Sequence, residues 1–193
     1  MYPRIASAVM LAAMILMLAI RAPHGARSAR IKVARSAKNR REIVLLAVAW
    51  IGYLAPLAWM VVPALSVADY PLRPAPLLVG AACLALGLWG FRQSHADLGT
   101  NWSATLEIRE THRLVTHGVY RSVRHPMYTA LLLYSIGQAL VVPNWVAGPA
   151  NLIALAALMM LRLPVEERLM LDTFGSEYAA YMSRTKRLVP GVW

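Results

Sequence analysis

The sequence predicts an all-α integral membrane protein with about five transmembrane helices. Hydrophobic residues make up 59% of the 193 residues and charged residues only 15%, a balance typical of membrane proteins. The apolar residues form continuous runs instead of recurring every three or four positions, so a soluble bundle would leave whole helix faces uncovered. Several runs approach the roughly 20 residues that cross a hydrocarbon core of about 30 Å.

We expect the spans, in order, at residues 5–22, 43–67, 76–92, 127–142 and 145–163. Arg4 precedes the first span, but no small-residue cleavage pattern follows it, so we interpret it as a retained helix and not a signal peptide. The single cysteine, Cys83, lies inside the third span and is expected to be a packing residue. The sequence VPNW after the fourth span favours a tight turn into an antiparallel fifth helix.

Membrane orientation explains the net charge of +11. Residues 21–42 hold eight of the 20 Lys and Arg residues. If this basic loop is cytoplasmic, five spans place 92–126 and 164–193 on the same side, and only Arg4 and Arg73 lie outside. We therefore expect the N-terminus outside, the C-terminus in the cytoplasm, contact with membrane lipid, and no nucleic-acid partner.

The chain is predicted to form a single membrane domain, residues 1–193, with unevenly distributed chemistry. Residues 1–75 contain two spans and the basic loop, whereas residues 76–193 hold nearly all candidate site residues, after residue 92. The loop before the fourth span and the C-terminal tail are expected to close over the helix ends and form a cytoplasmic cofactor pocket. Within this loop, ATLEIRE alternates like a short strand, and Gly118 indicates a turn.

The first candidate cluster is the motif RHPMY at the start of the fourth span. Pro126 suits the first turn of a helix and disfavours helical conformation at His125, so the helix should begin at Pro126. Arg124, His125 and Tyr128 would then surround a helix N-terminus, which attracts a carboxylate or a phosphate. Arginine and tyrosine also serve as simple interface anchors, so the motif alone does not require a ligand.

The second candidate cluster contains Glu166 and Glu167, which follow the predicted end of the last span. Acidic residues at a helix C-terminus oppose the helix dipole, so a positive group should compensate them. Arg162 lies four residues before Glu166 and therefore on the same helix face. An ordinary ion pair would also explain these two residues, at about 0.3–0.5 kcal/mol if exposed. Ionisable groups this close to a bilayer usually face a bundle interior or a wet cavity.

Other chemistries find little support in the sequence. His95, His112, His117 and His125 lack ligand spacing with cysteines or acids, so we expect no metal site. The sequence also lacks a glycine-rich nucleotide loop in a strand–turn–helix context and a serine-hydrolase elbow.

The ordered combination of HRLVTHGVYRSVRHPMY, EERLMLDTFGSEYAAY and a closing LVP resembles the isoprenylcysteine carboxyl methyltransferase family and its bacterial relatives. Phospholipid N-methyltransferases are similar at greater distance. The resemblance covers about residues 84–190. It implies S-adenosyl-L-methionine bound on the cytoplasmic side, a lipophilic or lipidated substrate arriving from the bilayer, and, in a bacterium, an inner-membrane location.

The resemblance also implies roles for individual residues. Arg162 falls on the position of the family's substrate-binding arginine, and we expect it to act catalytically by orienting a substrate carboxylate. Glu166 matches the family's cofactor-binding carboxylate. Further implied cofactor contacts are Glu107, His112, Arg113, Leu114, Val115, Tyr120, His125, Pro126, Met127 and Tyr128. In chemical terms, Glu166 suits the ammonium of the cofactor, and the helix start at Pro126 with His125 suits its carboxylate.

The favoured hypothesis is an S-adenosylmethionine-dependent membrane methyltransferase that O-methylates an isoprenylcysteine-like carboxylate. N-methylation of a phospholipid or another lipid amine is the alternative within this class. A non-enzymatic membrane scaffold would use the same motifs only as anchors. A membrane reductase of the sterol type would need a nicotinamide site.

Overall fold

The computed structural model describes residues 2–110 and 112–191. The α-helices within these residues are α1 (Tyr2–Ser28), α2 (Arg40–Val61), α3 (Pro74–Leu98), α4 (Pro126–Val141) and α5 (Ala150–Arg184). Short 3-10 helices are η1 (Pro63–Ala68), η2 (Gly99–Asn101) and η3 (Gly118–Arg121), and the strands are β1 (Val33–Ser36) and β2 (Glu107–Arg109).

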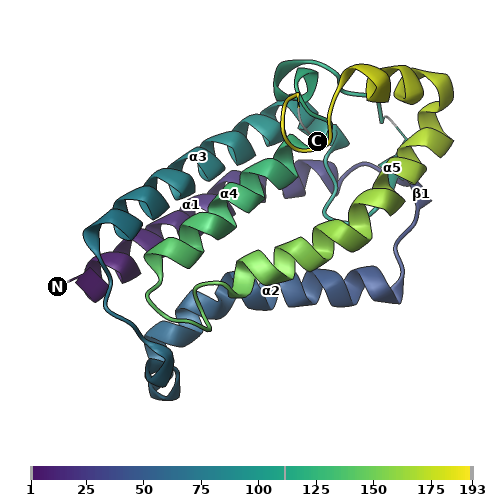
Figure 1. Ribbon diagram of the computed structural model, residues 1–193. Coiled ribbons are helices and arrows are strands. Elements are labelled where there is room, and N and C mark those ends of the chain that lie inside the picture. Colours follow the sequence, from purple (N-terminus) through teal and green to yellow (C-terminus); the bar gives the residue numbers. More distant parts are fainter. Residues whose placement is uncertain (1, 111, 192–193) are drawn as a thin grey trace.

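Helices α1, α3 and α4 pack side by side, while α2 runs along α5 (Figure 1). The most extensive contact is between α3 and α4, and glycine makes it possible. A Cβ atom on Gly87 would lie 2.8 Å from the Tyr134 amide nitrogen, and one on Gly137 would lie 2.7 Å from the Leu84 side chain. Small residues at such positions are typical of helices that approach closely within a membrane.

The outward faces of the helices are apolar, as contact with lipid requires. Ile51 on α2 is 69% exposed and Ile153 on α5 is 66% exposed. Among the described residues, three segments are long and apolar enough to cross a bilayer, namely Arg4–Ser28, Arg40–Val61 and Pro74–Asn101. The chain is therefore an integral membrane protein with a mostly helical fold, as predicted.

The last two helices differ from the predicted spans. Helix α4 has only 16 residues, which is short for a membrane span. Helix α5 is longer but is not among the segments apolar enough to cross a bilayer, because its charged side chains begin at Arg162. Helix α5 also starts at Ala150 instead of 145, because the turn before it is longer than VPNW. The Asn144 side chain holds this turn by accepting the amides of Val146 and Ala147 at 3.0 and 2.8 Å.

The first three helices have different ends from those predicted. Helix α1 continues past residue 22 to Ser28, and α3 continues past residue 92 to Leu98. Helix α2 begins at Arg40, where the Asn39 side chain accepts the Glu42 amide at 2.9 Å, a standard N-cap. It ends at Val61 and not at 67, because the following proline interrupts helical hydrogen bonding and starts η1.

The prediction that Glu166 and Glu167 follow a helix end is wrong. Helix α5 continues through both residues and reaches Arg184, with an interruption at Gly175, where φ is +51°. The helix changes direction there, so its last part lies across the end of the bundle (Figure 1). The helix dipole therefore does not explain the environment of the two glutamates, and specific neighbours must do so.

The basic loop, the connecting loop and the C-terminal tail meet at one end of the bundle. Strand β1 from the basic loop pairs antiparallel with β2, which confirms the short strand expected in ATLEIRE and supplies a partner that was not predicted. The tail pairs with the segment before α4 through a parallel bridge between Val123 and Lys186. The amides of Arg124 and His125 donate to carbonyls of this tail at 2.8 and 3.0 Å.

Candidate active site

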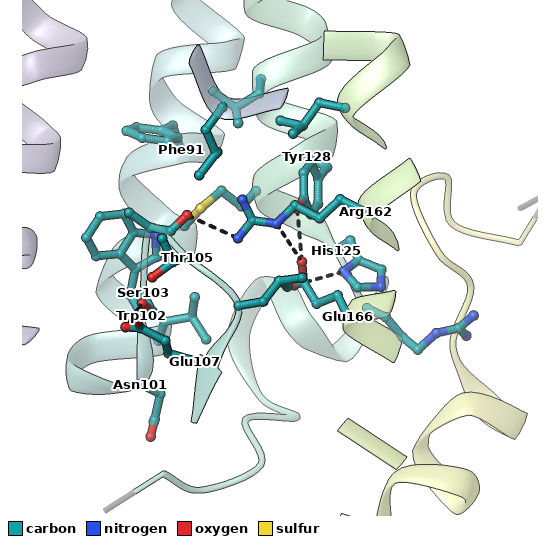
Figure 2. Close-up of a pocket in the computed structure, with 18 of the residues that line it drawn as sticks. Phe91, Asn101, Trp102, Ser103, Thr105, Glu107, His125, Tyr128, Arg162 and Glu166 are labelled. Atoms are coloured by element: carbon teal, nitrogen blue, oxygen red, sulfur yellow. Dashed lines mark hydrogen bonds and ion pairs between the residues drawn. The ribbon is translucent and has the colours of Figure 1, made fainter. Parts of the chain in front are cut away.

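A cavity of about 270 Å³ opens at this polar end, lined by residues from all five α-helices and the connecting loop (Figure 2). Its volume lies near the lower end of small-molecule sites, about 300 Å³. All but one of the predicted site residues line it, namely Glu107, His112, Arg113, Leu114, Val115, Tyr120, His125, Met127, Tyr128, Arg162 and Glu166. Pro126 is the exception, because it is buried at the start of α4 and sets where that helix begins.

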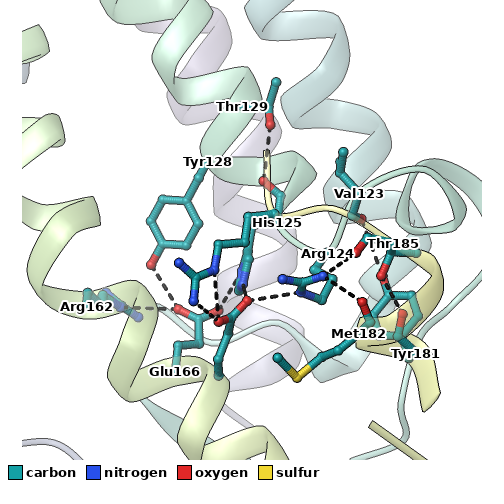
Figure 3. A network of polar contacts seen from close by, with 12 residues as sticks. Val123, Arg124, His125, Tyr128, Thr129, Arg162, Glu166, Tyr181, Met182 and Thr185 are labelled. Carbon is teal, nitrogen blue, oxygen red and sulfur yellow. Dashed lines mark hydrogen bonds and ion pairs between the residues drawn. The ribbon is translucent and has the colours of Figure 1, made fainter. Parts of the chain in front are cut away.

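Glu166 lies where the two predicted clusters meet (Figures 2 and 3). The Tyr128 hydroxyl donates to its Oε2 atom at 2.9 Å, and Arg162 Nε lies 3.6 Å from the same oxygen. His125 Nδ1 lies 3.7 Å from the other oxygen. The Glu166 side chain is still 29% exposed, so this carboxylate is accessible to a ligand in the cavity.

The start of α4 produces this geometry. His125 has φ −126° and ψ 56°, outside the helical region, and the helix begins at Pro126, as predicted. Tyr128 then lies on the first turn and reaches across to Glu166 on α5 (Figure 3). The four-residue spacing of Arg162 and Glu166 brings their charges together, also as predicted.

Glu167 has a different environment, and its side chain is only 5% exposed. It accepts hydrogen bonds from Arg124 Nε at 3.0 Å and from Arg187 Nη2 at 2.7 Å, and His125 Nε2 lies at 3.4 Å. Burial raises the pKa of Glu167, but hydrogen bonds from His125, Arg187 and Arg124 outweigh burial and hold the pKa at about 2. Glu167 is therefore a carboxylate at neutral pH that joins α5 to the α4 start and the tail.

The C-terminal tail holds the RHPMY motif in place. Arg124 Nη1 donates to the carbonyls of Met182, at 3.3 Å, and Thr185 (Figure 3). The Tyr181 hydroxyl donates to the Tyr120 carbonyl at 2.6 Å. Burial raises the pKa of Tyr181 to about 12, so its hydroxyl keeps the proton that it donates. The paired motifs therefore belong to one hydrogen-bonded unit.

The connecting loop between α3 and α4 is held by hydrogen bonds on both sides of the segment that lines the cavity. The Arg113 amide donates to Asn101 Oδ1 at 3.0 Å, and the Val119 amide donates to Asp97 Oδ2 at 2.8 Å. Gly118 has φ +58°, and a Cβ there would lie 2.0 Å from the Asp97 carboxylate, so the predicted turn requires glycine. Between these anchors, residues 112–115 line the cavity.

Arg162 also contacts a residue from the part of the chain where little chemistry was expected. Its Nη2 atom lies 3.6 Å from Glu42 Oε1 of α2 and donates to the Ala104 carbonyl at 3.1 Å. Glu42 is 4% exposed and accepts the Leu106 amide at 2.7 Å. Glu42 was not predicted as a site residue, because an acid three residues after Asn39 is typical of an ordinary helix start.

Helices α1 and α2 contribute further cavity residues, including Arg21, Trp50 and Tyr53. The sequence signal for Arg21 was an arginine at the end of an apolar run, but the positive-inside rule already explained that arginine without a site. The cavity therefore combines the accessible Glu166 carboxylate, four arginines (Arg21, Arg113, Arg124 and Arg162) and apolar walls. Within residues 2–110 and 112–191, no group of three or more His, Cys, Asp or Glu residues could hold a metal ion.

Comparison with known proteins relates this chain to a family. The profile of the family described as phospholipid methyltransferase matches residues 76–177. The chain is 33% identical over 96 residues to protein-S-isoprenylcysteine O-methyltransferase B of Arabidopsis thaliana, a match covering 49% of each chain. The corresponding Homo sapiens protein is 32% identical over 94 residues, covering 48% of this chain and 33% of the human protein.

The chain therefore spans about half, or less, of the length of the curated relatives that it matches. A solved eukaryotic intramembrane Ras methyltransferase, isoprenylcysteine carboxyl methyltransferase, superposes with a TM-score of 0.55 at 24% identity. That match covers 81% of this chain and 55% of the solved one, and it shows a shared fold. The relatives confirm the resemblance found in the paired motifs. The chain belongs to the phospholipid methyltransferase family, and the curated relatives that it resembles in sequence are named protein-S-isoprenylcysteine O-methyltransferases.

Proposed function

We propose that the chain is an S-adenosyl-L-methionine-dependent membrane methyltransferase acting on a lipophilic acceptor. The observation that carries the proposal is the convergence of Tyr128, His125 and Arg162 on the accessible carboxylate of Glu166 inside one cavity. The names of relatives that match, such as the Arabidopsis thaliana and Homo sapiens protein-S-isoprenylcysteine O-methyltransferases, support the same chemistry.

The residues present fit this methyl donor. When bound, S-adenosylmethionine supplies a methyl group on a sulfonium, and the electrons of the broken carbon–sulfur bond stay on sulfur while the acceptor gains the methyl group. Glu166 would pair with its ammonium group, because an accessible carboxylate among hydrogen-bond donors is suited to a charged amine. The loop residues His112 to Val115 and Tyr120 would hold the adenosine part. His125 would assist at the amino-acid end.

The favoured acceptor is an isoprenylcysteine-like carboxylate. A carboxylate needs no general base, so the protein has to orient it, hold it near the methyl group and exclude water. Arg162 suits this task because its guanidinium can bind a carboxylate with two parallel hydrogen bonds. Apolar residues of α2, α4 and α5 that line the cavity, such as Leu46, Leu131 and Leu158, suit the hydrocarbon part of the acceptor.

A phospholipid or another lipid amine is the second candidate acceptor, because the matching family profile is that of phospholipid methyltransferases. An amine must be neutral to act as a nucleophile, so this reaction would need a proton acceptor near the site. Methyl-transfer assays with farnesylcysteine and with phosphatidylethanolamine separate the two acceptors.

We further propose that the polar end faces the cytoplasm and the N-terminus lies outside, which in a bacterium places the protein in the inner membrane. The charge distribution supports this orientation, since the basic loop, connecting loop and tail share the polar end. Cysteine labelling from either side of sealed vesicles tests it, using Ser183→Cys at the exposed tail in a Cys83→Ala background.

Binding in detergent tests the cofactor assignment. The purified protein is titrated with S-adenosylmethionine, S-adenosylhomocysteine and NADPH. We expect micromolar binding of the first two, lost in Glu166→Ala and His125→Ala and retained in Glu177→Gln, which changes an exposed acid on the same helix. Binding of NADPH alone would favour a reductase, and no binding by a folded sample would favour a scaffold.

A further inference from the structure

Arg21, near the polar end of α1, lies between two indole rings at the wall of the cavity. Its guanidinium carbon is 5.4 Å from the centre of the Trp50 ring and 5.2 Å from that of Trp102. All three residues line the cavity. Trp102 is itself fixed, because Ser28 donates a hydrogen bond to its carbonyl and the His95 ring lies 4.9 Å away.

The charge balance distinguishes Arg21 from Arg162 and Arg124, which form ion pairs at this site, and from Arg113, which is exposed to solvent. Arg162 faces two carboxylates, Glu42 and Glu166, and Arg124 is paired with the buried Glu167. In the part of the chain that the structure describes, no carboxylate forms an ion pair with Arg21. Among the described residues, its contacts are with the two indole rings, and it lines the same cavity as Arg162.

A cation in an apolar cavity of a membrane protein is costly unless an anion or polar groups compensate it. The two rings stabilise the guanidinium through their π-electrons and hold it in one position. They do not neutralise it, and they leave its N–H donors available. Arg162, by contrast, already shares its charge with two glutamates. The cavity therefore has unmatched positive charge on the α1 side.

We propose that Arg21 is a second anion-binding residue, which holds the carboxylate of the membrane-borne acceptor together with Arg162. This inference rests on the proposed methyltransferase function and specifies its acceptor as an anion. It assigns acceptor recognition to a residue outside the segment, 76–177, that matches the family profile. Methylation converts the bound carboxylate to a neutral ester, so the same contact would favour the acid substrate over its product.

The competing explanation is that Arg21 is only an interface anchor, with its charge directed toward lipid head groups. An anchor predicts no difference between acid and ester ligands. A carboxylate-binding residue predicts that its loss weakens the acid selectively. The two explanations therefore differ in a binding measurement that does not depend on turnover.

The experiment measures equilibrium binding of N-acetyl-S-farnesylcysteine, its methyl ester and S-adenosylhomocysteine to detergent-purified protein. The variants are Arg21→Gln, Arg21→Lys and the control Arg27→Gln, which removes an exposed arginine from the same helix. We expect Arg21→Gln to weaken the acid about tenfold or more while leaving the ester and S-adenosylhomocysteine unchanged. Arg21→Lys should retain part of the preference for the acid, and Arg27→Gln all of it.

Equal affinity of wild type and Arg21→Gln for the acid would overturn the inference, as would equal weakening of acid and ester. Retained S-adenosylhomocysteine binding shows that the variant is folded. If Arg21→Gln does not fold, Arg21→Lys decides, because an anchor role predicts an unchanged ratio of acid to ester affinity. If the wild-type protein methylates only phosphatidylethanolamine, the proposed acceptor is wrong and this inference fails with it. If it binds no methyl donor, the proposed function fails first.

Discussion

Replacing Glu167 with glutamine tests whether the ion pairs of this buried side chain join the C-terminal tail to the start of α4. Glutamine keeps the size of the side chain but removes the charge that faces Arg124, Arg187 and His125. The pKa of Glu167 is lowered from 4.5 to about 2, which corresponds to about 3 kcal/mol of favourable interaction with the ionised form. Removing one partner of a buried ion pair typically costs a similar amount, about 3–5 kcal/mol.

We therefore expect Glu167→Gln to lower the thermal midpoint by about 6–12 °C, at about 2–4 °C per kcal/mol for a chain of this size. Intrinsic tryptophan fluorescence in detergent measures the midpoint, and Glu177→Gln on the same helix serves as the exposed control. Because folding lowers the pKa, the stabilisation is complete above about pH 4.5 and is lost as the pH falls toward 2. A midpoint equal to that of wild type, or a difference that persists unchanged at pH 3, would refute the reasoning.

Three further variants test the cavity. Arg162→Lys should lower kcat/KM for a farnesylcysteine acceptor by about 10–100-fold, because lysine loses the two-pronged hydrogen bond; an unchanged kcat/KM would contradict its role. Tyr128→Phe removes the 2.9 Å hydrogen bond to Glu166 and should weaken S-adenosylhomocysteine binding about fivefold by calorimetry, whereas unchanged binding would show that this hydroxyl does not position the carboxylate. Glu42→Ala leaves the Leu106 amide without its acceptor and should lower stability by about 1–3 kcal/mol in denaturant titrations, and an unchanged midpoint would argue against this contact.

Local rules predicted the features that depend on neighbouring residues. Proline at position 126 defined the start of α4 because its ring excludes helix before it. The spacing of Arg162 and Glu166 placed both on one helix face. Gly118 predicted a turn, and the turn has the positive φ that favours glycine.

Features that depend on segments far apart in the sequence could not be predicted from neighbouring residues. The spacing to Arg162 and the resemblance singled out Glu166, but no local pattern predicted that Glu167 would face Arg124, Arg187 and His125 instead of the cavity. The reason is that consecutive residues on a helix point about 100° apart, so their environments depend on which elements pack on each side. Pairing of β1 with β2, and of Glu42 with Arg162, likewise required knowing that α2 lies along α5.

The extent of the helices was also difficult to predict from hydrophobicity. Helix α5 continues well beyond its apolar part because a buried ion pair with Arg124 and a hydrogen bond to the Tyr120 carbonyl, both from the segment before α4, stabilise the charged segment. An apolar run locates the part of a helix in contact with lipid but does not define where the helix ends. The interruption at Gly175 marks the change of direction, and a single glycine inside a helical pattern is only a weak signal for it.

A structure determined with bound S-adenosylhomocysteine tests the central claim most directly, because the claim is that both polar clusters bind one methyl donor. We predict that the amino group of the ligand lies within hydrogen-bond distance of the Glu166 carboxylate, at about 2.7–3.2 Å, beneath the loop of residues 112–115. A ligand bound elsewhere, with Glu166 still engaged only by Tyr128 and Arg162, would contradict the account.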